Sequence, residues 1–238
     1  TEETKVASTV AIEKVVEQKK ESEQANLVID NKTKSGLAII EGVHYVKLKS
    51  PIQFEGLEDY SVLEIFWLGC PHCQNFEEGV RKWKPNKAEG LQLKKMHAVS
   101  QDPRWIMDAH IYTTFEKLSN NNEKVMEGLF DLYIAQFKEY KAAIEKDKKT
   151  SVKGTPSFKL IQEYAVASNI SAEDFSATFQ SEETKAEVSK AGEEFVKAEL
   201  SGVPAFIVNK EYMITGKDAK SYEDYFQIVE KVAELTKK

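Results

Sequence analysis

Residues 66–80, FWLGCPHCQNFEEGV, contain the only two cysteines of this 238-residue chain, Cys70 and Cys73, with a proline and a histidine between them. Before the pair, residues 61–68 (SVLEIFWL) are rich in β-branched and aromatic residues, which is typical of a buried strand. After the pair, apolar residues recur at helical spacing until Pro85. The stretch therefore predicts a strand that leads directly into a helix, with the cysteines at the start of that helix.

Pro71 fits the first helical position, where its missing N–H costs nothing. Residues 91–99 (LQLKKMHAV) predict another strand after the helix. The order strand, helix, strand indicates a βαβ unit with a C-x-x-C motif at the N-terminus of its helix.

The cysteine pair has three possible roles. A structural disulfide would close a very short loop and remove little entropy from the unfolded chain. A zinc site needs four ligands, yet no second C-x-x-C or histidine pair exists, and His44, His97 and His110 are scattered singly. We therefore favour a redox-active dithiol, which needs no cofactor besides the Cys70–Cys73 disulfide and no metal.

The two thiols are expected to differ in reactivity. A thiolate at a helix N-terminus faces unpaired N–H groups and the positive end of the helix dipole, which lower its pKa. Cys70 lies at that end, so we expect it to be the attacking thiol, with a pKa of roughly 3.5 to 7.5. Cys73 lies one turn inside and is expected to be the slower, resolving thiol. His72 favours the Cys70 thiolate by positive charge or by a hydrogen bond.

Composition narrows the class of protein. The chain is 41% hydrophobic and 30% charged, with a net charge of −6, which is an ordinary globular balance. Its lysines are interspersed with glutamates, whereas a nucleic-acid partner would require a concentrated basic face. No apolar run approaches the roughly 18 to 20 residues that span a bilayer. The chain begins TEETKVASTV, without methionine, so we expect a processed or trimmed chain whose export signal has been removed.

The chain divides into four regions. Residues 1–41 are polar and rich in Lys and Glu, which predicts a helical or flexible N-terminal extension. Residues 101–195 contain successive helix patterns with start signals such as Asp102-Pro103 and Ser171. Strand patterns occur in residues 42–100 and return in 196–238, before a final amphipathic helix. These patterns predict an α/β unit interrupted by a helical insertion.

The sequence resembles the DsbA family of bacterial periplasmic thiol:disulfide oxidoreductases from about residue 42 to the end. The resemblance rests on 62–78 (VLEIFWLGCPHCQNFEE), 169–175 (NISAEDF) and 202–214 (GVPAFIVNKEYMI). It implies a thioredoxin fold interrupted by an inserted helical domain. It also implies a periplasmic, monomeric oxidase that passes its disulfide, through a mixed disulfide at Cys70, to reduced, unfolded exported proteins. A quinone-linked inner-membrane protein of the DsbB type would reoxidise it.

The resemblance also implies roles for charged residues near the dithiol. Glu64 matches a buried acid beneath the disulfide, and Lys95 matches a lysine that pairs with it. Together they would relay the proton that Cys73 exchanges; the alternative is a structural ion pair with no kinetic role. Glu77 matches an acidic residue of the active-site helix, although we expect it to lie on a solvated helix face.

Two prolines compete for the cis position that faces the cysteines in thioredoxin folds. Pro204 precedes the apolar, strand-like AFIVN, whereas Pro156 precedes a helix-like segment and reads as an ordinary helix-start proline. We choose Pro204, which would make Val203 a substrate contact. Gly69 departs from the family, in which a bulky apolar residue precedes the first cysteine.

Two other functions stay open at this point. A disulfide isomerase or reductase would use the same fold and the same thiol chemistry. A non-catalytic holdase would instead bind unfolded peptides through an apolar rim around Trp67 and Val203.

Overall fold

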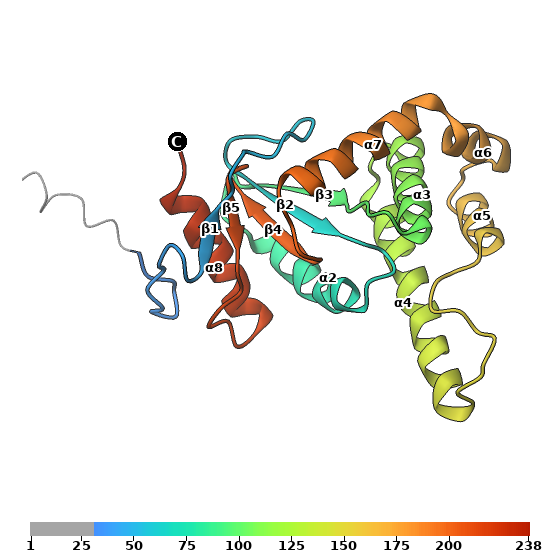
Figure 1. The fold of residues 1–238 in the computed structure, drawn as a ribbon, viewed down its shortest axis with the longest axis horizontal. Helices are drawn as coiled ribbons and strands as arrows, with labels where there is room; N and C mark the ends of the chain where they lie inside the picture. Colours follow the sequence, from blue (N-terminus) through green and yellow to red (C-terminus); the bar gives the residue numbers. More distant parts are fainter. Residues whose placement is uncertain (1–30) are drawn as a thin grey trace, which may run out of the picture.

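A five-stranded mixed sheet runs through the centre of the protein, whose computed structural model describes residues 31–238 (Figure 1). In spatial order its strands are β1 (Tyr45–Lys47), β5 (Tyr212–Ile214), β4 (Ala205–Val208), β2 (Ser61–Phe66) and β3 (Gln92–His97). β2 and β3 are parallel and the other neighbours antiparallel. The predicted strands are all present, and the sheet with its helical insertion is the expected α/β class.

The central strand β2 is buried along its whole length because both faces of the sheet are covered. On one face, Val62 belongs to a core cluster shared with α2 (Pro71–Trp83) and α8 (Tyr222–Leu235). On the other face, Leu63 and Ile65 pack with the loop before β2 and with the helical insertion. The strand that carries Glu64 therefore has no solvent-facing side.

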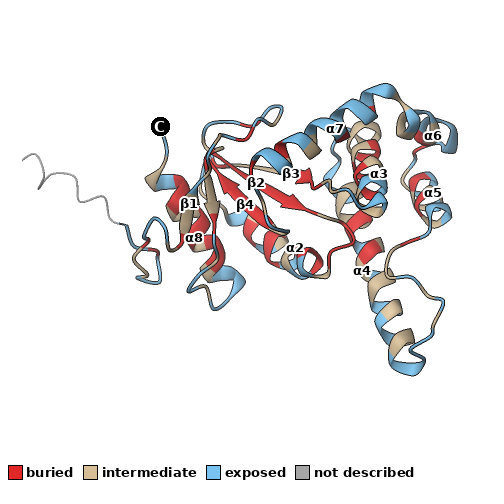
Figure 2. Cartoon of the chain, in the orientation of Figure 1, coloured by how far each residue is buried: buried red, intermediate tan, exposed pale blue. Residues whose placement is uncertain are grey.

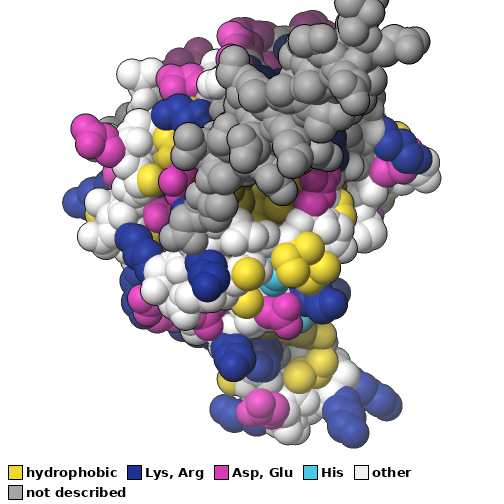
Figure 3. Space-filling view, turned by 90° about the vertical axis from the view of Figure 1, so that its left-hand side faces the viewer, with side chains coloured by type: hydrophobic (Ala, Val, Ile, Leu, Met, Phe, Trp, Pro, Cys, Tyr) yellow, Lys and Arg dark blue, Asp and Glu magenta, His cyan; other side chains and the backbone are white. Residues whose placement is uncertain are grey.

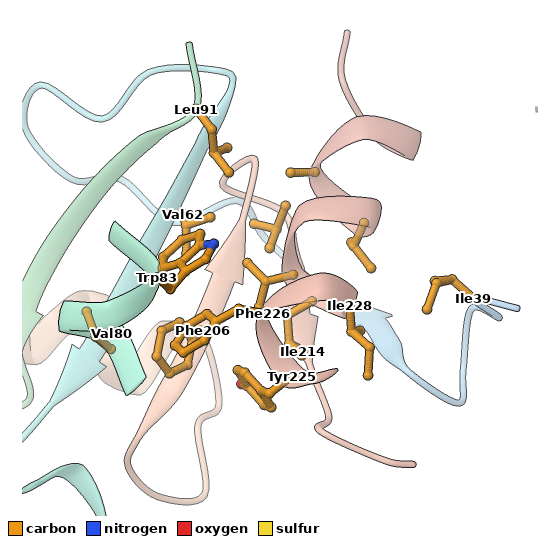
Figure 4. Packing of buried hydrophobic residues seen from close by; sticks show 14 residues of the cluster. Ile39, Val62, Val80, Trp83, Leu91, Phe206, Ile214, Tyr225, Phe226 and Ile228 are labelled. Atoms are coloured by element: carbon orange, nitrogen blue, oxygen red, sulfur yellow. The ribbon is translucent and has the colours of Figure 1, made fainter. Parts of the chain in front are cut away.

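Aromatic side chains fix α2 and α8 against the sheet. Trp83 of α2 stacks on Phe226 of α8 with ring centroids 4.5 Å apart and an interplanar angle of 7°. Phe206 of β4 meets Phe226 edge-on at 5.7 Å, and Tyr225 packs beside them (Figure 4). Such aromatic contacts add about 0.5–1.5 kcal/mol each to the burial of the rings. They hold the helix that presents the cysteines in a defined position on the sheet.

The helical insertion contains α3 (Pro103–Ser119), α4 (Glu123–Lys146), α5 (Phe158–Ala167), α6 (Ala172–Gln180) and α7 (Glu182–Lys197). Each begins at a side-chain cap, as the start signals predict for two of them: the caps are Asp102, Asn122, Ser157, Ser171 and Ser181. α7 ends two residues beyond the expected boundary at 195. Over the described residues, no helix combines the length and apolar character that a membrane span requires.

The second half of α4 projects from the body together with the loop to α5 (Figures 1 and 2). The buried residues of α4 are Leu129, Phe130 and Tyr133, all in its first half. Beyond them the helix has intermediate and exposed residues only, up to Asp147. This segment is therefore held by fewer tertiary contacts than the rest of the insertion.

Residues 31–41 belong to the folded body, which corrects the predicted boundary of the extension at residue 41. Ile39 is 4% exposed and joins the core cluster of α2 and α8, and Leu37 packs against the same cluster. Thr33 is also buried, and a bridge joins Lys32 to Ala38. The prediction missed this because two isolated apolar residues make no periodic pattern. The rest of the predicted extension, 1–30, lies outside the described residues.

Substitution of Ile39 tests this correction. Ile39→Ala should lower the free energy of unfolding by about 3 kcal/mol, because it removes buried methyl groups and leaves a cavity. Ile40→Ala is the matched control: its side chain is 52% exposed, so the effect should stay within about 0.5 kcal/mol. Urea unfolding followed by circular dichroism measures both, and equal effects would show that this segment does not contribute to the core.

Candidate active site

Cys70 is the N-cap residue of α2. Its backbone is extended (φ −83°, ψ 118°), and its sulfur accepts a hydrogen bond from the Cys73 N–H at 3.5 Å. Pro71 occupies the first turn, and Gln74 donates the first helical hydrogen bond to the Cys70 carbonyl, at 3.0 Å. The structure thus places both cysteines and Pro71 as the sequence predicts, with Cys70 at the positive end of the helix.

The pKa of Cys70 is lowered to about 6, within the range expected from the sequence. The largest cause is the hydrogen bond from the Cys73 side chain, followed by the backbone N–H groups of Cys73 and His72 and the charge of His72. Partial burial acts in the opposite direction. His72 itself is exposed. At neutral pH the Cys70 sulfur is therefore mostly a thiolate, although it is 7% exposed.

Cys73 has the opposite electrostatic environment. Its side chain is fully buried in the cluster formed by Phe66, Leu68 and the insertion. Burial raises its pKa most strongly, and the neighbouring Cys70 and Glu64 raise it further. Cys73 is therefore a thiol whenever the pair is reduced at neutral pH, which fits the predicted division between an attacking and a resolving sulfur.

The segment before β4 faces the cysteines. The Cys70 Sγ lies 3.7 Å from the Val203 carbonyl oxygen, to which it donates a hydrogen bond as a thiol. The Val203–Pro204 peptide bond is cis, and no other cis bond occurs among the described residues. Pro156 is instead buried one residue before the cap of α5, outside its first turn. The structure thus selects Pro204 of the two candidates.

Three charged residues form a network beneath the dithiol. Lys95 of β3 places its Nζ 3.1 Å from Glu64 Oε2 and 2.5 Å from Glu77 Oε2. Glu77 also accepts a hydrogen bond from Arg81 at 3.1 Å. The expected Glu64–Lys95 pair is present, but the prediction that Glu77 lies on a solvated helix face is wrong. Its side chain is 4% exposed because it contacts Lys95 of β3 and because α2 packs against α4.

Glu64 has the fewest polar partners of the three charged residues in this network. It is fully buried, and neither carboxylate oxygen accepts a hydrogen bond within the described part of the chain, despite the close approach of Lys95. Burial raises its pKa, and the attraction of Lys95 only partly offsets that. The pKa of Lys95 is raised by the two carboxylates, although burial opposes this. The arrangement is a buried acid that takes up a proton more readily than an ordinary glutamate.

The loop between β2 and α2 is held by two side chains, His97 and Gln74, for which the sequence predicts no role at the site. His97 Nε2 accepts a hydrogen bond from the Leu68 N–H at 3.2 Å, and Gln74 Nε2 donates one to the Leu68 carbonyl at 2.9 Å. Burial lowers the pKa of His97 to about 3, so its ring is neutral and able to accept. Neither residue belongs to a recognisable motif. Both act by fixing the backbone that leads to Cys70.

Trp67 connects the active-site loop to the insertion. Its Nε1 donates to Asp108 Oδ2 at 2.8 Å, and its ring stacks on Trp105 with centroids 4.7 Å apart. Asp108 is fully buried and also accepts from Tyr133. The Trp67 ring lies over Gly69, where a Cβ atom would come within 2.5 Å of it. This contact explains the departure from the family at residue 69: a larger side chain cannot coexist with the position of Trp67.

The remaining histidines do not gather at the site. His44 pairs with Asp218 at 3.3 Å, and His110 contacts the Phe179 carbonyl. Over residues 31–238, no group of three or more His, Cys, Asp or Glu side chains is arranged to hold a metal ion. The described site consists of the dithiol, its charged network and the segment at Pro204.

Comparison with known proteins agrees with this geometry. Residues 108–225 match the model of the DSBA-like thioredoxin domain family. The thiol:disulfide interchange protein DsbA of Azotobacter vinelandii is 26% identical over 193 residues, which cover 81% of this chain and 82% of the relative. The chain is similar to the DsbA family over most of its length. These matches support a thiol:disulfide oxidoreductase with a thioredoxin fold.

Other members of the family match over a similar length. The thiol:disulfide interchange protein DsbL of Escherichia coli O6:H1 is 24% identical over 201 residues, covering 82% of this chain and 87% of its own. A crystal structure of a Pseudomonas aeruginosa DsbA variant has a TM-score of 0.65 at 22% identity, over 83% of this chain and 97% of that one. Proteus mirabilis DsbA with a bound peptide, PWATCDS, has a TM-score of 0.62 at 22% identity, covering 85% and 100%.

Alkylation rates should distinguish the two thiols of this protein. Because only the thiolate reacts, labelling of Cys70 should follow a titration with a midpoint near pH 6, while Cys73 stays unlabelled until far higher pH. Mass spectrometry of peptides from the reduced protein gives both rates. His72→Leu keeps the backbone N–H and removes only the side-chain charge, so it should raise the midpoint slightly. Labelling of Cys73 first would reverse the assignment.

Removal of the Glu64 charge should stabilise the protein. The folded pKa of Glu64 is raised, so its contribution to stability is present below its unfolded pKa and is lost as the pH rises through the folded value. Glu64→Gln should therefore increase the free energy of unfolding of the disulfide form by about 1 kcal/mol at pH 7. The difference should shrink as the pH is lowered.

Substitution of Lys95 provides the contrasting variant. Lys95→Met should cost about 3 kcal/mol, because two buried carboxylates lose their shared cation. Urea melts of the disulfide forms at several pH values measure both variants. A clear loss of stability in Glu64→Gln at pH 7 would mean that the ion pair is a net stabilising contact.

Proposed function

We propose that this protein is a dithiol oxidase that donates the Cys70–Cys73 disulfide to exported proteins as they fold. A substrate thiolate attacks the Cys70 sulfur, a mixed disulfide forms at Cys70, and the bond to Cys73 breaks. A second substrate thiolate then attacks the substrate sulfur, and Cys70 leaves. The substrate loses two electrons and two protons and gains a disulfide, while the protein becomes a dithiol. The observation that carries the proposal is the lowered pKa of Cys70, which makes it a good leaving group.

The charged network supplies the proton in this scheme. Cys73 leaves as a thiolate in a site where burial strongly favours the thiol, so it must take up a proton. Glu64 raises the pKa of Cys73 and binds a proton readily, because its own pKa is raised. Lys95 is 19% exposed and joins Glu64 to the surface side of the network. We assign Glu64 and Lys95 to proton transfer in the first step and in its reverse during reoxidation.

The pKa of Cys70 favours oxidation of substrates over their reduction. The folded value of about 6 is below the unfolded value of about 8.5, so its contribution to stability is complete above about pH 8.5 and is lost as the pH falls through about 6. At pH 7 the reduced form gains roughly 1 kcal/mol, allowing for some solvent screening, and the disulfide form gains none. This raises the reduction potential by about 20 mV.

The resemblance to the DsbA family supports a proposal for the site of action and the partners. We place the protein in the bacterial periplasm, where reduced, unfolded exported proteins are the substrates and a quinone-linked membrane protein of the DsbB type restores the disulfide. Val203 and Pro204 are assigned to substrate contact because the Val203 carbonyl faces the Cys70 sulfur. The peptide in the related Proteus mirabilis structure supports a peptide substrate.

Trapping experiments test the proposal. Cys73→Ser, reduced and mixed with a one-cysteine peptide activated as its disulfide with a small aromatic thiol, should release that thiol and accumulate a mixed disulfide at Cys70, because neither Cys73 nor a second peptide thiol can resolve it. Cys70→Ser should accumulate none. Equilibration of the wild-type dithiol with glutathione should give a potential more oxidising than about −180 mV, the value typical of a disulfide isomerase. A value near −270 mV, typical of thioredoxin, would indicate a reductant instead.

A further inference from the structure

A helical finger beside the dithiol carries a net positive charge, although the chain as a whole is acidic. We define the finger as residues 137–155, the second half of α4 and most of the loop to α5. It has six lysines and three acidic residues, a local charge of +3, whereas the whole chain carries −6. Its lysines are Lys138, Lys141, Lys146, Lys148, Lys149 and Lys153. The rest of the chain therefore carries −9.

The lysines of the finger are not engaged with the protein's own acids. Most of the other described lysines form ion pairs with Asp or Glu, for example Lys82–Glu78, Lys117–Glu187 and Lys185–Glu182. Within the described residues, none of the six finger lysines forms an ion pair, and all six are exposed. In Figure 3 the finger is the lowest part of the molecule, where lysine side chains gather around apolar ones. Their charge is available to a partner.

A groove of about 610 Å³ separates the finger from the active-site loop. Its floor begins at Trp67 and Gly69, the residue before Cys70, and it continues along the finger. The finger contributes mostly partly buried apolar side chains and two lysines: Phe137, Tyr140, Ile144, Val152, Lys148 and Lys153. Arg104 lies in the same groove. The groove thus combines aromatic surface with positive charge and opens next to the reactive sulfur.

The groove is preformed because the loop packs back onto its helix. Gln136 Nε2 donates to the Lys153 carbonyl oxygen at 2.9 Å, which ties the returning loop to α4. Gly154 lies against the rings of Tyr140 and Phe137, where a Cβ atom would already be in van der Waals contact. A ligand that enters this groove therefore meets fixed aromatic surfaces, which reduces the entropy cost of binding.

We propose that the finger groove binds an acidic, aromatic-containing segment of the client polypeptide while the client cysteine reacts at Cys70. This inference rests on the proposed function and adds the class of client. The unpaired lysines complement an acidic segment, and the ring surfaces accept an adjacent aromatic residue. A polypeptide fits better than a lipid surface, because the groove is concave and continuous with the residues that precede Cys70. One client polypeptide can therefore occupy the groove and reach the Cys70 sulfur at the same time.

Matched peptides test the proposal. Two peptides share one cysteine pair and one tryptophan, and differ only in a flanking run of Glu or of Gln. The readout is the ratio of their second-order oxidation rate constants with the full-length, oxidised protein, measured by acid quench and mass spectrometry. The ratio for Glu over Gln should be about 10 at low salt and should approach 1 at about 0.5 M salt, because the attraction is electrostatic.

A pair of double variants locates the effect. Lys148→Gln with Lys153→Gln removes the two groove lysines and should reduce the ratio to about 3 or less. Lys34→Gln with Lys217→Gln changes the net charge equally, at exposed positions in the segments that precede β1 and α8, and should leave the ratio near 10. A ratio near 1 for the wild-type protein, or equal losses in both double variants, would overturn the proposal.

Other occupants give different results. If the groove variant lowers binding to vesicles of anionic phospholipid but leaves the peptide ratio unchanged, the finger binds a membrane surface and the proposal is wrong. The proposal is also wrong if that variant changes only the sedimentation of the protein alone, which would indicate a second copy of the chain. Failure of the proposed function is separate: in that case neither peptide is oxidised by any variant.

Discussion

The burial of β2 on both faces is the constraint on which the site depends. All six residues of the strand are inaccessible, and successive side chains point to opposite faces of the sheet. A shift of one residue in the pairing with β3 and β4 would therefore move every side chain, Glu64 included, to the opposite face. The strand ends at Phe66, and the next four residues carry the chain to Cys70 at the cap of α2. The same alternation sends Glu64 beneath α2 rather than to the opposite face. The position of the dithiol and that of its buried acid are therefore set by one strand.

Two sulfur atoms three residues apart have opposite proton affinities because of where the helix begins. Cys70 lies outside the first turn and receives hydrogen bonds from Cys73 and from backbone N–H groups, which stabilise negative charge. Cys73 lies within the helix, on its inner face, among apolar side chains and near Glu64. A negative charge on Cys73 is disfavoured most by burial, and a backbone hydrogen bond at Trp67, which lowers the pKa of Cys73, only partly offsets this. A single helix terminus thus separates the roles of chemically identical groups.

The features that could be predicted from the sequence depend on residues that are close together in the chain. The strand before Cys70, the cap at Asp102 and the capping box at Ser171 depend on neighbours within a few residues, and the structure has each of them. Glu77 was misjudged because its burial results from β3 and α4, which are distant in sequence. Asp108, which holds Trp67 from α3, leaves no local signal.

The position of Pro204 came from a contrast between two following segments, strand-like after one proline and helical after the other. The local sequence pattern thus predicted which proline faces the cysteines in the folded protein. The prediction succeeded because the strand that follows Pro204 pairs with β2, which leads to Cys70. Ile39 shows the converse. A single apolar residue in a polar segment gives no pattern, and only the surface formed by α2 and α8 shows that it is buried. The roles of Glu64 and Lys95 came from family resemblance, since spacing alone does not bring β2 and β3 side chains together.

The distribution of partners within the charged network explains why Glu64 is the member suited to exchange a proton. Glu77 has two cations, Lys95 and Arg81, and retains both whatever the state of its neighbour. Among residues 31–238, Glu64 has Lys95 as its one ion-pair partner and its carboxylate oxygens accept no hydrogen bond. When Glu64 is protonated, Lys95 still has Glu77 as its counter-ion, so no buried charge is left without a partner. When Glu64 is ionised, Lys95 serves both carboxylates. The network therefore accommodates both protonation states at the position next to Cys73, at the cost of a buried carboxylate that is poorly stabilised in one of them.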